Sequence, residues 1–330
     1  MAVNQDWDRR ALLAALAAAS ATPAVAQVGF STTFRTGDES RILNNLVTRM
    51  AARVAVNGRE RYAFVIDTGA GRTSVSDRVA AEMRLPPGPE VLVHGVTSAV
   101  MTPTVRLGRL EFGGRLFNDL VCPVFPQEQL AADGLVGLDV LSRFRLTFDL
   151  GALQVTLAPS GGSAVETSET FHEATRMGRE GRSSAIARFG QLVLLTASAE
   201  GQPIDLFVDS GAQYSIGNPA LMAMIDRYTP RSTPRERIQI FGVIGQSIEA
   251  RIGEVRDLRI ARHDLGTTPL LFADLHAFRV LGLSERPAML MGADLLTRFR
   301  QVSLDYGRAR MIFAGLRRAR PFAGYPTEGP

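Results

Sequence analysis

Lysine is absent from this chain of 330 residues, so arginine supplies all 37 of its Lys-plus-Arg side chains. The absence excludes a catalytic Schiff base, a pyridoxal phosphate lysine and the lysine of a Walker loop. The single cysteine, Cys122, excludes an intrachain disulfide and a cysteine-based zinc site. The four histidines are scattered without the spacing of metal ligands; they are His94, His172, His263 and His276. We therefore expect no metal and no cofactor.

Aromatic residues are also few, at 7% of the chain, and the net charge of +4 is spread along the sequence. A mild basic cluster stands at Arg317, Arg318 and Arg320. Nucleic-acid binding usually needs a focused basic face with aromatic platforms for the bases. We therefore interpret the charge as a solvated surface and expect no nucleic-acid partner; an acidic partner is the weaker alternative.

The N-terminal apolar stretch, Ala11–Ala19, is too short for a good membrane span. It follows Arg9-Arg10 and precedes Ala24-Val25-Ala26, a small-x-small cleavage pattern before Gln27. This arrangement predicts a signal peptide over residues 1–26, similar to the twin-arginine type, and hence a periplasmic or secreted protein without a membrane span after signal removal. The alternative is an alanine-rich N-terminal helix, and the mass of the native protein distinguishes the two.

Two short strings are near copies of each other. Phe64-Val65-Ile66-Asp67-Thr68-Gly69-Ala70 recurs as Leu206-Phe207-Val208-Asp209-Ser210-Gly211-Ala212. Each apolar run predicts a buried strand that ends at an aspartate, where a tight turn begins. Aspartate is common in such turns, so one copy alone would be structural. Two copies in matching settings predict a pair of carboxyl groups that share one proton.

The repeat continues downstream of each aspartate. Residues 134–145 and 289–300 share two apolar residues, a glycine, an aspartate, a leucine and a closing Ser/Thr-Arg-Phe-Arg string. Strand pairs around a glycine turn follow at 146–157 and 302–313. After each Asp-Thr/Ser-Gly string the sequence predicts a short helix: Ser76 caps Asp77–Met83, and Asn218 with Pro219 opens Ala220–Ile225.

These ordered elements resemble the aspartic proteases of the pepsin and retropepsin type, over roughly residues 45–157 and 190–314. Asp-Thr-Gly-Ala and Asp-Ser-Gly-Ala look like the retropepsin form, and the closest likeness is to bacterial proteins with both lobes on one chain. The resemblance implies an all-β fold of two homologous acid-protease β-barrel lobes with short helices, related by a pseudo-twofold axis. The expected parts are a signal (1–26), two lobes (27–157 and 185–314), an interlobe linker (158–184) and a tail (315–330).

The resemblance also implies roles for particular residues. Asp67 and Asp209 would hold the attacking water, and Thr68 and Ser210 would support their loops through hydrogen bonds. Gly69 and Gly211 would allow the close backbone approach that a Cβ blocks. Asp139 and Asp294 are expected to cap the short helices. Gly71 and Gln213 depart from the usual pattern, in which an acidic residue or Asn often follows the alanine.

A hairpin flap usually covers the site in such proteases. The candidates are Val91–Val105, with Gly95, Val96 and Thr97 near the tip, and Ile238–Ile252, with Gly242, Val243 and Ile244 near the tip. Neither tip has the tyrosine of the single pepsin flap, and two flaps match retropepsins better. The alternative is a pair of ordinary surface hairpins.

The function that the resemblance implies is an aspartic endopeptidase acting on an extended peptide or protein, as a monomer. The alternative is a peptide-binding or regulatory module on the same fold without turnover. The sequence favours the enzyme because both aspartates and both glycines are intact. A serine hydrolase is a poor third, since the sequence has no Gly-x-Ser-x-Gly elbow.

Overall fold

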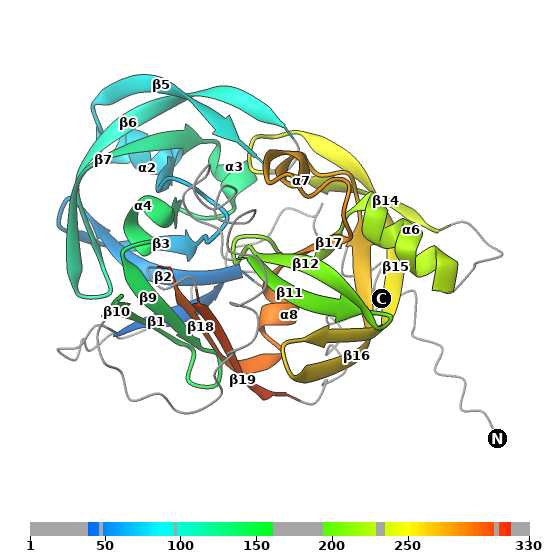
Figure 1. Ribbon diagram of the computed structural model, residues 1–330. Coiled ribbons are helices and arrows are strands. Elements are labelled where there is room, and N and C mark those ends of the chain that lie inside the picture. The colour runs from blue at the N-terminus through cyan, green and yellow to red at the C-terminus, as the bar shows by residue number, and fades with distance from the viewer. Residues whose placement is uncertain are drawn as a thin grey trace, which may run out of the picture. The chain divides into compact units, whose positions relative to one another are not determined.

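Strands make up most of the computed structural model, which describes residues 39–45, 49–95, 98–160, 194–228, 235–306 and 310–317 (Figure 1). They form two sheets joined by short helices, and the chain has the two-lobed all-β fold that the internal repeat predicts. The expected signal (1–26), residues 161–184 of the expected linker and residues 318–330 of the expected tail lie outside the described residues.

The first sheet contains twelve strands. They are β1 (Glu39–Asn45), β2 (Arg49–Val56), β3 (Arg59–Ile66), β4 (Ser74–Ser76), β5 (Pro87–His94), β6 (Ala99–Phe112), β7 (Arg115–Phe125), β8 (Gly134–Val136), β9 (Phe144–Asp149), β10 (Gln154–Pro159), β18 (Phe299–Asp305) and β19 (Arg310–Leu316). Their order is β19-β18-β9-β10-β1-β2-β3-β8-β4-β7-β6-β5. Central β2 is buried along nearly its whole length, as expected of a strand covered on both faces, whereas edge strand β5 alternates between exposed and half-buried residues.

The second sheet contains seven strands in the order β11-β12-β17-β13-β16-β15-β14. They are β11 (Leu194–Ala199), β12 (Gln202–Val208), β13 (Ile216–Gly217), β14 (Arg237–Phe241), β15 (Ser247–Ile260), β16 (His263–Phe272) and β17 (Ala288–Met291). Both halves share one topological detail: the strand before each Asp-Thr/Ser-Gly string pairs in parallel with the strand before the second glycine, as β3 with β8 and β12 with β17.

The helices within the described residues are short, and none is long and apolar enough to cross a membrane. They are α2 (Asp77–Glu82), α3 (Gln127–Leu130), α4 (Leu138–Leu141), α6 (Pro219–Tyr228), α7 (His276–Val280) and α8 (Ala293–Leu296). Both predicted helix starts are confirmed. Ser76 caps α2 by accepting from the Val79 amide at 3.2 Å, and the Asn218 side chain accepts from the Leu221 amide at 2.8 Å at the start of α6.

The last strand pair of the chain leaves its own half. Strand β18 pairs with β9 of the first half, from Gln301 opposite Asp149 to Asp305 opposite Arg145, so that β18 and β19 extend the first sheet. Strand β18, which the sequence places with the C-terminal lobe, therefore forms backbone hydrogen bonds with the N-terminal lobe, and β19 follows it by pairing with β18. This pairing ties the two halves together.

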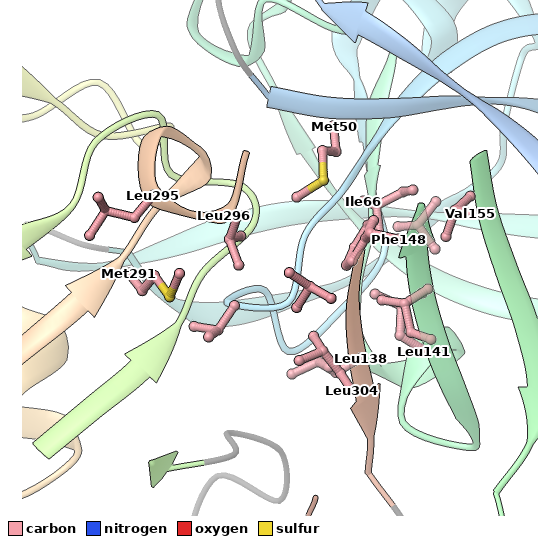
Figure 2. Packing of buried hydrophobic residues seen from close by; sticks show 14 of the residues in the cluster. Met50, Ile66, Leu138, Leu141, Phe148, Val155, Met291, Leu295, Leu296 and Leu304 are labelled. Carbon is pink, nitrogen blue, oxygen red and sulfur yellow. The ribbon is translucent and has the colours of Figure 1, made fainter. Parts of the chain in front are cut away.

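One apolar cluster runs through both halves. In Figure 2, Met50, Ile66 and Leu138 of the first half lie in the same region as residues of the second half; the latter include Met291, Leu295, Leu296 and Leu304. Leu304 reaches the cluster because β18 has crossed to the first sheet, where it stands opposite Leu146 of β9. Burial of this shared core holds the lobes together independently of the polar contacts described below.

The two helix caps should differ strongly in their value to stability. Asn218 is fully buried and makes four hydrogen bonds: its amide donates to the carbonyls of Leu283 and Arg286, and its oxygen accepts from the amides of Leu221 and Ala288. Asn218→Ala leaves these groups unpaired, at about 1–3 kcal/mol for each buried group. Ser76→Ala removes one capping bond, at about 1 kcal/mol.

Urea unfolding of both variants tests this difference. We expect Asn218→Ala to lose several times the unfolding free energy that Ser76→Ala loses. Asn218→Asp sets a buried carboxylate against the Leu283 and Arg286 carbonyls, so it should lose at least as much as Asn218→Ala. Equal losses for the two alanine variants would contradict the interpretation of Asn218 as a buried link between α6 and the segment before β17.

Candidate active site

Asp67 and Asp209 stand at the ends of equivalent strands. Asp67 directly follows β3, and its amide donates to the Val136 carbonyl of β8 at 3.0 Å; Asp209 directly follows β12, and its amide donates to the Met291 carbonyl of β17 at 3.0 Å. The parallel strand pairing therefore fixes the backbone of each aspartate from the side. Their side chains are only 9% and 8% exposed.

Each carboxylate is oriented by the turn that follows it. Asp67 Oδ1 accepts from the amides of Gly69 and Ala70 at 2.8 and 2.9 Å. In the second turn, Asp209 Oδ1 accepts from the amides of Gly211 and Ala212 at 2.9 and 3.1 Å. One oxygen of each carboxyl group is thus held by two amides, which leaves the other oxygen for a second partner.

The two turns pack against each other through their glycines. A Cβ built on Gly69 would lie 2.6 Å from Asp209 Cγ, and one built on Gly211 would lie 2.4 Å from Asp67 Cγ. Only glycine fits at either position, because any side chain would overlap the opposite carboxyl group. Each carboxyl group therefore lies directly against the turn that carries the other. The structure thus brings together the two aspartates that the sequence paired.

Thr68 and Ser210 connect the two loops by a reciprocal set of four buried hydrogen bonds. The Thr68 hydroxyl donates to the Val208 carbonyl at 3.1 Å and accepts from the Ser210 amide at 3.0 Å. The Ser210 hydroxyl donates to the Ile66 carbonyl at 2.6 Å and accepts from the Thr68 amide at 3.2 Å. Each hydroxyl therefore satisfies one backbone donor and one backbone acceptor of the other lobe.

The second glycine of each half passes directly against its aspartate loop. A Cβ on Gly137 would lie 2.3 Å from the carbonyl carbon of Arg72, and one on Gly292 would lie 2.6 Å from that of Tyr214. Each of these glycines also donates its amide to a hydroxyl of the aspartate loop. The Gly137 amide donates to Thr73 Oγ1 at 3.1 Å, and the Gly292 amide donates to Ser215 Oγ at 2.9 Å. These contacts hold the two aspartate loops in position.

The expectation that Asp139 and Asp294 cap the short helices is wrong. The N-cap residues of α4 and α8 are Gly137 and Gly292, which make no side-chain cap. Asp139 instead accepts from the Thr73 hydroxyl at 2.7 Å, and Asp294 from the Ser215 hydroxyl at 2.6 Å. Each aspartate thus holds the hydroxyl that in turn receives the glycine amide, a long-range role that local sequence does not signal.

Burial raises the pKa of both central aspartates. For Asp67, the amides of Gly69 and Ala70 and the positive charge of Arg49 act against this rise. For Asp209 the pKa rises well above its usual range, since the charge of Asp67 adds to the effect of burial. Because the groups interact, the protons leave in two steps that belong to the pair and not to either residue.

Two residues near the pair were missed by the sequence analysis. Arg49, at the start of β2, is buried and attracted to both carboxyl groups. Tyr306, which follows β18, lies beside the Thr68 side chain, and burial and the charge of Asp67 raise the pKa of its hydroxyl. A charged residue at the head of an apolar strand was a signal for Arg49. No sequence signal pointed to Tyr306, because only the pairing of β18 with the first sheet brings this residue to the site.

The two candidate flaps are both hairpins. In the first, β5 pairs with β6, and the Gly95 amide donates to the Ser98 carbonyl at 2.7 Å; Val96 and Thr97 lie outside the described residues. In the second, β14 pairs with β15, and Gly245 turns the chain with a φ of +79° and donates to the Gly242 carbonyl at 3.0 Å.

The tips of these hairpins meet. A Cβ on Gly95 would lie 2.9 Å from Cδ1 of Ile244. Val93 of the first hairpin, together with Val243 and Ile244 of the second, packs on a small apolar cluster of the first lobe, and Ala70 beside the Asp67 turn packs on it too. The hairpins therefore contact each other and the wall next to the aspartate loops.

A pair of histidines adds a second contact between the lobes. Nδ1 of His94, at the end of β5, lies 3.0 Å from Nε2 of His276, at the start of α7, and the rings are parallel. Arg279 follows on α7 and is paired with Asp274. Burial, His94 and Arg279 all lower the pKa of His276. The sequence analysis described these histidines as scattered.

Comparison with known proteins gives one family. Residues 52–143 match the family model described as gag-polyprotein putative aspartyl protease, a span that contains Asp67 and Gly137. Among solved structures, the chain is similar to a retropepsin-like aspartic protease from Rickettsia conorii, with 18% sequence identity, a TM-score of 0.28, and coverage of 36% of this chain and 90% of that chain. No curated protein matches the chain.

The hydrogen bonds of Thr68 and Ser210 should be strongly coupled. Thr68→Val leaves the Ser210 amide and the Val208 carbonyl unpaired in the interior, and should cost about 1–3 kcal/mol of unfolding free energy. Ser210→Ala should cost a similar amount. Because they share one network, the double variant should lose less than the sum by at least about 0.5 kcal/mol in a denaturant-based mutant cycle. Thr68→Ser keeps the hydroxyl and serves as the control; strictly additive losses would contradict a joint network.

The His94–His276 contact should be sensitive to pH. A hydrogen bond between imidazoles needs one nitrogen without a proton, so the contact is complete above the ordinary pKa of about 6.5 and is lost as pH falls through the lowered pKa of His276. Hydrogen exchange of the β5–β6 hairpin, corrected for intrinsic rates, should therefore be faster at pH 5 than at pH 7.5. His276→Gln should abolish this difference. Equal protection at both pH values would refute the prediction.

Proposed function

We propose that this chain hydrolyses peptide bonds with a water molecule activated between Asp67 and Asp209; the match of residues 52–143 to an aspartyl protease family model supports this. The observation that carries the proposal is that two buried carboxyl groups, each held by its own turn, pack against each other's glycine. Two acids held in this way share one proton, so that one serves as base and the other as acid.

The reaction follows from this arrangement. The ionised carboxylate takes a proton from the water as the water oxygen attacks the carbonyl carbon of the peptide. The protonated carboxyl group gives its proton to the carbonyl oxygen, which yields a neutral tetrahedral diol. Collapse of the diol breaks the C–N bond: the carboxyl group that took the water proton gives it to the amine nitrogen, while the other carboxylate takes a proton from a diol hydroxyl. The pair is left with one proton, ready for another cycle.

The substrate that fits this chemistry is an extended peptide. A peptide bound as a strand offers backbone hydrogen bonds to a neighbouring edge, and its alternating side chains enter separate pockets. We propose the β5–β6 and β14–β15 hairpins as the two flaps over it, with Gly95, Val96 and Thr97 at one tip and Gly242, Val243 and Ile244 at the other. The contact of Gly95 with Ile244, and the packing of Val243 beside Ala70, support this assignment.

A peptide-binding module without turnover is the alternative on the same fold. Burial of two carboxyl groups in contact costs free energy, because desolvation and mutual repulsion both oppose their ionisation. A module that only binds a peptide gains nothing from that cost. The intact pair, with a glycine packed against each carboxyl group, therefore favours hydrolysis.

Replacement of either aspartate tests the proposal. Asp67→Asn and Asp209→Asn each remove the shared proton arrangement at nearly constant volume, so each should lower peptide cleavage by at least about 100-fold while the circular dichroism spectrum stays unchanged. The wild-type protein should cleave a mixture of unstructured peptides from mildly acidic to neutral pH. Activity should fall as pH rises through the upper pKa of the pair, since the acid then loses its proton.

Two controls accompany this digestion. A statine-type mimic of the diol should inhibit cleavage, whereas addition of a chelator should leave the rate unchanged. Cleavage that survives in either Asn variant, or that requires added metal, would show that the assignment of Asp67 and Asp209 is incorrect. Binding of a peptide with full affinity and no product in the wild type would favour the binding module instead.

A further inference from the structure

Arg49 is a buried cation that has no role in the reaction proposed above. Its residue is 8% exposed, at the head of a strand whose other members are almost all apolar. The guanidinium donates to the Leu130 carbonyl at the end of α3. Among the described residues, no carboxylate forms an ion pair with it within 4 Å. A buried charge needs opposite charge nearby, because its desolvation otherwise costs several kcal/mol.

The sheet register places that opposite charge. Strands β2 and β3 are antiparallel, with Ala51 opposite Val65. Continued by two residues, back along β2 and forward past the end of β3, this register sets Arg49 opposite Asp67. Directly opposed residues project to the same face of a sheet, with Cβ atoms about 4.5–5.5 Å apart. The guanidinium is accordingly attracted first to Asp67 and second to Asp209.

In the sequence, the corresponding position of the second lobe is not a cation. The same two-residue step from the pair Leu194 and Phe207 leads to Asp209 on one strand and, in the sequence, to Leu192 on the other; Leu192 lies outside the described residues. The nearly symmetric aspartate pair is thus set in an asymmetric charge distribution. Tyr306 beside Thr68 does not restore the balance, since the raised pKa of its hydroxyl keeps it neutral.

We propose that Arg49 is a positioning residue for the catalytic pair: its guanidinium holds the single negative charge of the pair on Asp67 and so leaves the shared proton on Asp209. The inference rests on the proposed function and assigns its two roles. Asp67 takes the proton of the attacking water, and Asp209 gives its proton to the substrate carbonyl oxygen. The cation also favours both ionisations of the pair, so each occurs at a lower pH than an uncharged residue at position 49 would allow.

Carbon-13 NMR of the protein labelled at the aspartate carboxyl carbons tests this without any need for turnover. Asp67→Asn and Asp209→Asn assign the two signals. In the wild type near pH 7, the Asp67 signal should be that of a carboxylate and the Asp209 signal that of a protonated acid. The reverse assignment would overturn the proposal, whatever happens to variants of Arg49.

Variants at position 49 separate charge from structure. Arg49→Gln retains a donor for the Leu130 carbonyl without the charge, and Arg49→Met removes both; each should raise both titration midpoints of the pair by about one pH unit. Arg49→Lys keeps the charge and should keep the wild-type midpoints to within a few tenths of a unit. Arg53→Met removes a cation from the same strand, opposite Ala63, and should change nothing.

The pH profile of peptide cleavage provides the second measurement. Both limbs of the kcat/KM profile should move to higher pH in Arg49→Gln and stay in place in Arg49→Lys and Arg53→Met. If the titration midpoints of the pair stay unchanged in folded Arg49→Gln, Arg49 serves only as a structural link to Leu130, and the proposal is overturned. A wild-type chain that titrates as expected but cleaves no peptide would refute the proposed function and leave the charge assignment standing.

Discussion

The structure depends on the contact between two loops that each bring a carboxyl group into the interior. Gly69 presses on Asp209 and Gly211 presses on Asp67, so neither loop is complete without the other. Buried carboxyl groups in contact repel each other when both are ionised. The cross-lobe hydrogen bonds of Thr68 and Ser210 hold the loops together against that repulsion. The parallel strand pairings next to the loops also stabilise this contact. So do Asp139 and Asp294, which accept hydrogen bonds from the Thr73 and Ser215 hydroxyls.

A chain that folds as two similar lobes must also keep them together. Here three different interactions do so: the buried apolar cluster, the pairing of β18 with β9, and the polar contacts at the site. The apolar cluster supplies most of the free energy, since it removes a large area from water. The polar contacts are few and directional, and they set the position of the loops. The crossed hairpin joins these functions, because it carries both Leu304 into the core and Tyr306 to the loops.

The internal repeat gives the two lobes similar backbones around the aspartates, but the charges near the two aspartates differ. Both aspartates receive two turn amides, and both stand on equivalent strands. We attribute their difference to Arg49, which the continued register of β2 and β3 sets opposite Asp67. An acid and a base need different proton affinities. We propose that this chain combines two similar backbone lobes with an uneven charge distribution, and that the uneven charge assigns the roles of acid and base.

The sequence by itself determined the features that depend on neighbouring residues. The apolar runs before Asp67 and Asp209, the hydroxyl of Ser76 before α2 and the Asn218-Pro219 start of α6 each act within a few residues, so their patterns could be interpreted directly. The pairing of Asp67 with Asp209 was also predictable, because the Asp-Thr/Ser-Gly-Ala motif occurs twice in the chain. The helix-capping role given to Asp139 was wrong, because its partner, Thr73, lies far away in the sequence.

Only the tertiary structure decided which distant residues surround the pair. Nothing near Arg49 in the sequence indicates that it faces Asp67; the register of β2 with β3 does. Nothing near Tyr306 or His94 indicates Thr68 or His276 as a partner. The physical reason is that local conformation follows from short-range sterics and periodicity, whereas contacts between distant segments follow from how whole faces pack to bury apolar surface.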